Sequence, residues 1–122
     1  MIGYTSLGTN DLQAAAHFYD TLFDLLTAYR IFSAPDFIVW ACEGKESKFS
    51  IHAPHNKEQA TVGNGVMVAL SAESKELVDS SYELALSLGA TCEGSPGYRM
   101  EGFYAAYFRD LDGNKLNVHV FE

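Results

Sequence analysis

Residues 102–121 read GFYAAYFRDLDGNKLNVHVF, and this stretch decides the fold. Two runs rich in aromatic and β-branched residues flank Asp-Leu-Asp-Gly-Asn, in which Asp and Gly tolerate the backbone angles of a tight turn. The pattern therefore predicts a strand, a turn and a second strand. In the second strand Leu116, Val118 and Val120 alternate with polar and aromatic side chains. One face should pack on a core, while the other presents groups suited to binding.

The residues before this hairpin predict a strand, a helix and a further short strand. Residues 65–72 have the composition of a strand, and Ser74 is a suitable N-cap for the helix that follows. Gly89 is placed to end that helix, because glycine readily adopts the left-handed conformation found just beyond helix C-termini. We expect a short strand at residues 90–93 and a loop at residues 94–102.

The first half of the chain shows the same order of elements. A strand is expected at residues 1–9, and Asn10 with Gln13 three residues later forms the pattern of a capping box. The helix should span residues 11–26 and bury an apolar stripe. The stripe consists of Leu12, Ala15, Ala16, Tyr19, Leu22, Phe23 and Leu26. Three strands follow, at residues 27–33, 36–42 and 47–53.

The two halves are related by an internal repeat. Tyr4 corresponds to Met67, which lies 63 residues later (67 − 4). The closing strands also match, since KFSIH at residues 48–52 aligns with KLNVH at residues 115–119 at an offset of 67 (115 − 48). The larger offset reflects a longer loop in the second half. A repeat of this length indicates one supersecondary unit that is used twice.

The repeat predicts an α+β fold in one domain built from two βαβββ modules. The modules are residues 1–54 and 65–122, and the polar segment 55–64 is the linker. Each sheet should carry its helix on one face, and we expect the other faces to form a cup-shaped mixed sheet. By strand alternation, the residues expected to face the cup are Tyr4, Ser6, Ser50, His52, Met67, Ala69, Asn117 and His119.

The charge and composition argue against several classes of partner. The net charge is −8 at pH 7 and the sequence pI is about 4.8, so phosphate backbones and anionic lipid surfaces would be repelled. We therefore expect no nucleic-acid partner and no membrane partner. The longest apolar run, residues 37–42, is too short to span a bilayer, and residues 1–20 show no secretory signal. Cys42 and Cys92 lack metal or redox spacing, which favours free thiols in the cytoplasm.

The chain resembles the vicinal oxygen chelate superfamily, which includes glyoxalases, bleomycin-resistance proteins and extradiol dioxygenases. The resemblance covers essentially the whole chain. It rests on LGTNDL at residues 7–12, FYD at 18–20, VMVAL at 66–70, GSPGYR at 94–99 and DLDGNKL at 110–116. It implies paired βαβββ modules of the glyoxalase/bleomycin resistance/dihydroxybiphenyl dioxygenase-like fold, and usually a homodimer.

The resemblance also places the positions at which metal-dependent relatives hold a divalent ion, with His, Glu and sometimes Tyr or Gln as ligands. Carried over to this chain, those positions are Tyr4, Ser50, Met67 and Asn117. Serine, methionine and asparagine are poor ligands for nickel, zinc or ferrous iron, so we expect neither a metal nor another cofactor. One alternative is a displaced ion bound by His52 and His119 together with Tyr4.

Three hypotheses for function follow. The first is a metal-free binding module for a small, partly apolar ligand, in which Tyr4, Asn117, His52 and His119 provide polar contacts. Arg99 follows a Pro-Gly bend and could clamp an anionic group, although a solvated loop arginine is the simpler interpretation. The second is a glyoxalase-like lyase or isomerase, or a dioxygenase, that uses displaced metal ligands, or His119 as a general base. The third is a regulatory partner protein; for lactoylglutathione we predict no isomerisation.

Overall fold

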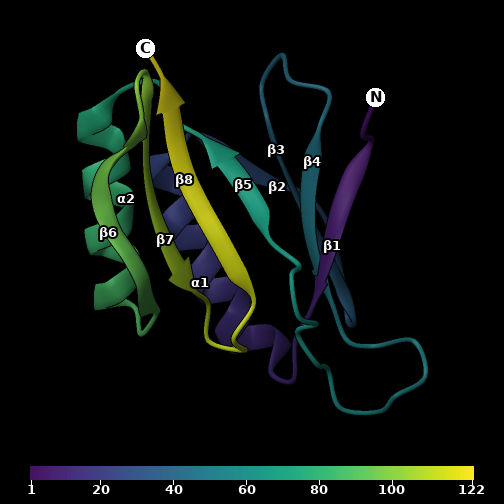
Figure 1. Ribbon diagram of the computed structural model, residues 1–122. Helices are drawn as coiled ribbons and strands as arrows, with labels where there is room; N and C mark the ends of the chain where they lie inside the picture. The colour runs from purple at the N-terminus through teal and green to yellow at the C-terminus, as the bar shows by residue number, and fades with distance from the viewer. The chain divides into compact units, whose positions relative to one another are not determined.

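The computed structural model describes residues 1–122 and divides them into two compact units. Unit 1 is Met1–Val62 and unit 2 is Gly63–Glu122. Each unit contains one helix and one four-stranded sheet in the order strand, helix and three strands, as Figure 1 shows. The predicted α+β class and the two βαβββ modules are therefore confirmed. Neither helix is long and apolar enough to cross a membrane.

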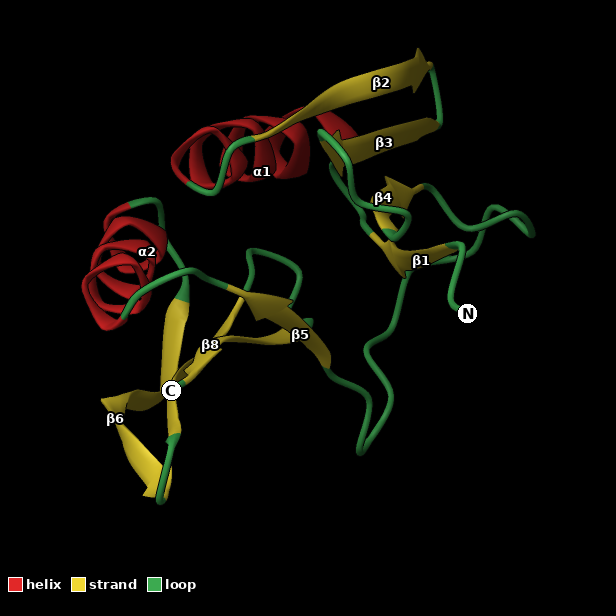
Figure 2. Cartoon of the chain, turned by 90° about the horizontal axis from the view of Figure 1, so that it is seen from above, coloured by secondary structure: helices red, strands yellow, loops and turns green.

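Unit 1 builds its sheet in the strand order β1-β4-β3-β2. Its elements are β1 (Tyr4–Gly8), α1 (Leu12–Leu25), β2 (Ala28–Ala34), β3 (Phe37–Cys42) and β4 (Lys48–His52). The first strand pairs in parallel with the last, and the other two pairings are antiparallel. Helix α1 packs against one face of this sheet (Figure 2).

The core of unit 1 lies between α1 and its sheet and is largely aromatic. The helix buries Ala15, Ala16, Phe18, Tyr19, Leu22 and Phe23. The ring centroid of Tyr19 lies 4.7 Å from that of Phe49 and 5.9 Å from that of Trp40. Aromatic ring pairs at such centroid distances each add about 0.5–1.5 kcal/mol beyond the area that they bury. The predicted stripe is thus confirmed in its central turns, and Phe18 is buried with it.

The predicted capping box at the start of α1 is wrong by one residue. Asp11 is the N-cap, and its carboxylate accepts a hydrogen bond from the backbone N–H of Ala14 at 3.1 Å. The Asn10 side chain instead accepts from the N–H of Ala60 at 2.7 Å and donates to the Ala60 carbonyl at 3.3 Å. An amide side chain can both accept from and donate to the backbone of one residue, so Asn10 fixes the segment after β4, while Asp11 caps the helix.

Unit 2 repeats the arrangement with the strand order β5-β8-β7-β6. Its elements are β5 (Val68–Ser71), α2 (Lys75–Ser87), β6 (Thr91–Met100), β7 (Phe103–Arg109) and β8 (Lys115–Phe121). Helix α2 packs mainly on β7 and β8. The predicted caps are confirmed, because the Ser74 hydroxyl accepts from the N–H of Leu77 at 3.1 Å and Gly89 has a φ of 109°.

The predicted loop at residues 94–102 is wrong, since β6 continues as a strand to Met100. Its pairing with β7 shifts register three times, between Cys92 and Gly94, between Gly94 and Gly97, and between Tyr98 and Met100. These bulges accommodate extra residues without ending the strand. Pro96 is tolerated because β6 lies at the edge of its sheet, where an absent backbone donor breaks no ladder.

The internal repeat is confirmed at the level of strand register. Ser6 pairs with Ser50 in unit 1, and Ala69 pairs with Asn117 in unit 2. The first members differ by 63 residues (69 − 6) and the second by 67 (117 − 50), which are the two offsets found in the sequence. The equivalent strands of the two units therefore present equivalent residues to equivalent faces.

The predicted hairpin at the end of the chain is also confirmed. β7 and β8 pair without a register shift from Phe103 opposite Phe121 to Arg109 opposite Lys115. In the turn the carboxylate of Asp110 accepts from the N–H groups of Asp112 and Asn114, both at 2.9 Å. This ring of hydrogen bonds closes the turn that the sequence Asp-Leu-Asp-Gly-Asn predicted.

Candidate functional site

In unit 1 the sheet face opposite α1 carries a hydrogen-bonded serine and histidine. The parallel pairing of β1 with β4 sets Gly8 opposite His52, so that Ser6 and His52 lie on the same face. The Ser6 Oγ and the His52 Nδ1 are 2.6 Å apart. This contact orients the imidazole ring and leaves Nε2 as the nitrogen that can meet a ligand.

Aromatic side chains surround this histidine. The Phe37 ring centroid lies 6.4 Å from that of His52, 6.0 Å from that of Phe32 and 6.3 Å from that of Tyr4. We call Tyr4, Phe32, Phe37 and His52 the unit 1 aromatic cluster. Tyr4 is 60% exposed and Phe32 is 53% exposed. Large rings gathered at an exposed face are typical of surfaces that bind a ligand or a partner.

The Ser50 hydroxyl is committed to the sheet itself. Ser50 is fully buried, and its Oγ donates to the Thr5 carbonyl at 2.7 Å. A buried hydroxyl that already donates to a backbone carbonyl has little to offer a ligand. Among the residues that the sequence placed on this face, the structure brings Tyr4 and His52 into one cluster and leaves Ser50 as a support beneath them.

In unit 2 the equivalent histidine is held by an asparagine. The Nδ1 of His119 lies 2.8 Å from the Oδ1 of Asn117. An amide oxygen only accepts hydrogen bonds, so Nδ1 carries the proton and Nε2 presents its lone pair. Burial lowers the pKa of His119 below its ordinary value, which keeps the ring neutral at pH 7. This imidazole is therefore ready to accept a hydrogen bond or a proton.

His119 also lies among aromatic rings. Its ring centroid is 5.4 Å from that of Phe103 and 5.3 Å from that of Phe121, and the two phenyl centroids are 4.9 Å apart. We call Phe103, His119 and Phe121 the unit 2 aromatic cluster. Phe121 is 71% exposed. Both histidines of the repeat thus occupy the same strand position and stand beside exposed rings.

The two remaining predicted residues, Met67 and Arg99, lie elsewhere in unit 2. Met67 directly precedes β5 and is exposed. Arg99 belongs to β6 rather than to a loop, and its guanidinium carbon lies 5.2 Å from the ring centroid of Tyr107. It donates to the carbonyls of Gly97 at 3.0 Å and Ser95 at 2.6 Å. Arg99 is therefore an exposed side chain whose guanidinium is held by hydrogen bonds to its own strand.

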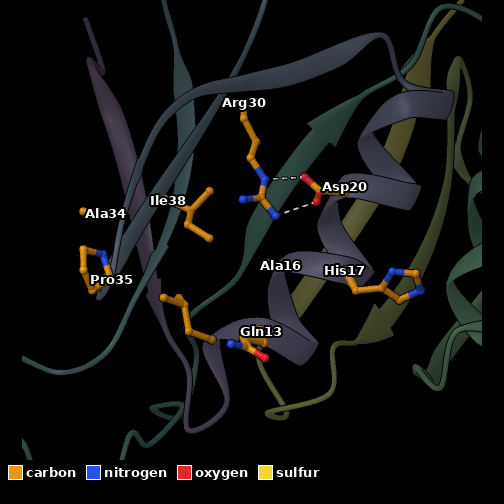
Figure 3. Close-up of a pocket in the computed structure, with 9 residues that line it drawn as sticks. Gln13, Ala16, His17, Asp20, Arg30, Ala34, Pro35 and Ile38 are labelled. Atoms are coloured by element: carbon orange, nitrogen blue, oxygen red, sulfur yellow. Dashed lines mark hydrogen bonds and ion pairs between the residues drawn. The ribbon is translucent and has the colours of Figure 1, made fainter.

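Unit 1 also contains a hollow of about 410 Å³ on the helix side of its sheet, which the sequence did not predict (Figure 3). It is lined by Leu12, Gln13, Ala16, His17, Asp20, Arg30, Ala34, Pro35 and Ile38. Asp20 accepts from Arg30 at 2.6 and 2.8 Å and from the indole N–H of Trp40 at 2.9 Å. The hydrogen bond from Arg30 lowers the pKa of Asp20. These charged groups satisfy one another, so the hollow is a structural feature rather than a reactive site.

The four positions that the resemblance assigns to a metal carry unsuitable donors. Tyr4 is an exposed phenol and Met67 a thioether, while the oxygens of Ser50 and Asn117 are already engaged in hydrogen bonds. No group of three or more His, Cys, Asp and Glu side chains could hold a metal ion in this chain. Nickel, zinc and ferrous iron need several imidazole or anionic ligands, and this donor set does not supply them.

Sequence reasoning missed several members of these faces. Phe32, Phe37 and Phe103 lie in strands that are rich in apolar residues on both faces, so the composition of the strands does not single them out. Alternation within β3 does put Phe37 on the face opposite Ile38, which is buried. A comparison of that alternation with the predicted helix face could have identified Phe37. The hollow beside Arg30 had a weaker signal, namely one charged residue inside an otherwise apolar strand.

Comparison with known proteins agrees with this fold. The profile of the Glyoxalase/Bleomycin resistance protein/Dioxygenase superfamily matches residues 1–118. A glyoxalase/bleomycin resistance protein from Albidiferax ferrireducens is 32% identical, with a TM-score of 0.90 over 98% of this chain and 97% of that chain. A lactoylglutathione lyase from Agrobacterium tumefaciens is 24% identical, with a TM-score of 0.73 over 98% and 92%. No curated protein matches in sequence. The chain therefore belongs to the Glyoxalase/Bleomycin resistance protein/Dioxygenase superfamily.

Proposed function

We propose that this protein binds small, partly apolar organic molecules, and that in each unit the sheet face with the aromatic cluster provides contacts for them. One observation carries the proposal. The two repeat-related histidines, His52 and His119, are each held through Nδ1 within their own unit and each stand beside exposed aromatic rings. A core histidine needs no such exposed surroundings, whereas a binding face does.

The chemistry of these faces suits a ligand with an aromatic or unsaturated body and a few polar atoms. Exposed rings supply stacking area at low entropic cost, since each has only two rotatable side-chain bonds. The neutral His119 offers an acceptor at Nε2, and Tyr4 offers a phenolic hydroxyl. The proposed contact residues are Tyr4, His52, Met67, Arg99, Asn117 and His119, with Ser50 supporting the sheet.

The protein works in this proposal without the divalent ion of its metal-dependent relatives. The support is chemical, because no two of the four inherited positions carry a strong ligand with a free donor atom. An ion bound by His52 and His119 is the alternative. It would require each imidazole to use Nε2, which the hydrogen bonds at Nδ1 leave available.

A second candidate function is a lyase or isomerase with His119 as general base. It is favoured by the fixed tautomer and by the lowered pKa, which keep a lone pair at Nε2 near neutral pH. One structural neighbour is named as a lactoylglutathione lyase, but at 24% identity the likeness concerns the fold. We expect no isomerisation of lactoylglutathione, because that chemistry needs an electrophile beside the base.

Two further features belong to the proposal. We expect a homodimer, since edge strand β2 exposes Tyr29, Ile31 and Phe32 and leaves one row of backbone groups unpaired. We also place the protein in the cytoplasm, where Cys42 and Cys92 would stay reduced as free thiols.

Thermal-shift screening tests the proposed function. Aromatic and heteroaromatic compounds and glutathione adducts are added to the protein, and a true ligand should raise the melting temperature by about 2 °C or more near saturation. The shift should disappear in His52→Ala or His119→Ala. It should survive in His55→Ala, a matched control whose side chain is exposed in the segment after β4.

Metal analysis of protein purified without chelator or nickel resin separates the two candidates. We expect no stoichiometric divalent ion. An ion at one equivalent that is lost in both His52→Ala and His119→Ala would favour the enzyme. If no compound stabilises the folded protein and no ion is present, the binding proposal is wrong and a regulatory partner role becomes the better account.

A further inference from the structure

Unit 2 gathers positive side chains around one tyrosine on the sheet face opposite α2. The guanidinium carbon of Arg99 lies 5.2 Å from the ring centroid of Tyr107, and the Nζ of Lys115 lies 5.7 Å from it. Lys115 is on β8 and Tyr107 is on β7. Arg99 comes from β6, where a register shift between Tyr98 and Met100 redirects its side chain. Three strands thus contribute to one cluster.

The position of the Arg99 guanidinium is set before any ligand arrives. Its two terminal nitrogens donate to the carbonyls of Gly97 and Ser95, at 3.0 and 2.6 Å. A Cβ on Gly94 would lie 3.0 Å from the guanidinium Nη2 and 3.3 Å from the Tyr107 ring. Glycine at this position therefore lets the cation and the ring approach each other. A guanidinium held in this way loses little entropy on binding, while its remaining N–H groups stay available.

The cluster carries a local surplus of positive charge on an acidic protein. Arg109 forms an ion pair with Glu93 and also donates to the Gly113 carbonyl at 2.9 Å. Arg99 and Lys115 have no carboxylate within ion-pair distance; the three ion pairs of the chain involve other cations. The chain as a whole has a net charge of −8. Glu93 is paired with Arg109 and also feels the charge of Lys115, which helps to lower the pKa of that carboxyl. Two cations beside one ring, neither of them in an ion pair, are thus a specific feature of this face.

We propose that Arg99 and Lys115 form a carboxylate-binding subsite beside Tyr107, and that the ligand of this protein is an aromatic or unsaturated acid. A guanidinium fork matches the two oxygens of a carboxylate, and an ammonium adds a second charge-assisted hydrogen bond. The Tyr107 ring offers an apolar wall for the planar body next to the carboxylate. The inference rests on the proposed function, since it names the charge and class of the ligand bound there.

Binding of benzoate tests the inference, with benzamide as a neutral analogue of the same shape. Dissociation constants are measured by NMR titration of the ¹⁵N-labelled full chain. We expect benzoate to shift the amide resonances of Tyr107 and Lys115, and to bind at least about fivefold more tightly than benzamide. Raising the salt concentration from roughly 0.05 to 0.5 M should weaken the binding of benzoate and leave the binding of benzamide unchanged. Inorganic phosphate should compete more weakly than benzoate.

Matched variants locate the effect. Arg99→Gln and Lys115→Gln should each raise the dissociation constant for benzoate by about fivefold or more. Lys48→Gln removes the lysine at the repeat-equivalent position of unit 1 and should leave benzoate binding unchanged. Gly94→Ala should displace the guanidinium of Arg99 and weaken the binding of benzoate, while the protein stays folded. Its added methyl would meet the flexible end of Arg99 at 3.0 Å and the Tyr107 ring at 3.3 Å, so these side chains need to shift by only a few tenths of an ångström.

Three results would overturn the inference. The first is equal affinity for benzoate and benzamide, with resonance shifts only at the aromatic clusters; the proposed function would then stand and the carboxylate subsite would fall. The second is an equal loss in Lys48→Gln and Lys115→Gln, which would show that net charge rather than this cluster attracts the anion. The third is a lower dissociation constant for inorganic phosphate than for benzoate, which would show that the assigned class of ligand is wrong.

Discussion

Replacement of Asp20 by alanine should destabilise unit 1 mainly through Trp40. The indole N–H of Trp40 donates to the carboxylate of Asp20 at 2.9 Å, and Trp40 is 1% exposed. Without Asp20 this buried donor has no partner. The same carboxylate receives two hydrogen bonds from Arg30, which joins β2 to α1. The substitution thus removes one buried acceptor and one ion pair together.

The magnitude follows from the burial of each partner. A buried N–H left without an acceptor costs about 1–3 kcal/mol. The Arg30–Asp20 pair is partly solvated, with side chains 38% and 41% exposed, and contributes about 0–1 kcal/mol. We therefore expect Asp20→Ala to lower the free energy of unfolding by about 2–3 kcal/mol. Asp20→Asn keeps an oxygen for Trp40 and should cost about 1 kcal/mol or less.

Urea unfolding followed by fluorescence measures both variants, because Trp40 is the only tryptophan of the chain. Circular dichroism on the same samples checks that the transition involves the whole unit, and an unchanged denaturant slope shows that the loss is one of stability. The reasoning fails if Asp20→Ala costs less than about 0.5 kcal/mol, or if Asp20→Asn costs as much as Asp20→Ala.

Two other predictions concern unit 2. The Ser81 hydroxyl is buried without a hydrogen-bond partner, so Ser81→Ala should raise the free energy of unfolding by about 1 kcal/mol in thermal or urea unfolding, and a lower melting temperature would contradict this. Burial lowers the pKa of His119 below its ordinary value of 6.5. Between the lowered pKa of the folded state and 6.5, the unfolded chain therefore binds a proton that the folded chain does not. Stability should therefore fall as the pH drops below about 6.5, and His119→Gln should show a shallower fall in urea unfolding between roughly pH 7.5 and 5.5; equal slopes would disprove this role.

Much of the fold was predictable from local pattern. The hairpin of β7 and β8, the helix cores and the caps at Ser74 and Gly89 follow from alternation, from helical spacing and from turn residues. The repeat, with its offsets of 63 and 67, also puts His52 and His119 at equivalent positions. These features depend on neighbours along the chain, and the residues themselves therefore reveal them.

The tertiary structure decided which groups meet. Asn10 binds the peptide of Ala60, so Asp11 takes the N-cap, and the hydrogen bonds of β7 carry β6 past Pro96. Each outcome depends on a partner distant in sequence. The same is true of the site, because alternation alone places a side chain on a face without naming its neighbours. The bonds of His52 with Ser6 and of Arg99 with its own bulged strand arise from register and bulges, which are set by pairing between strands.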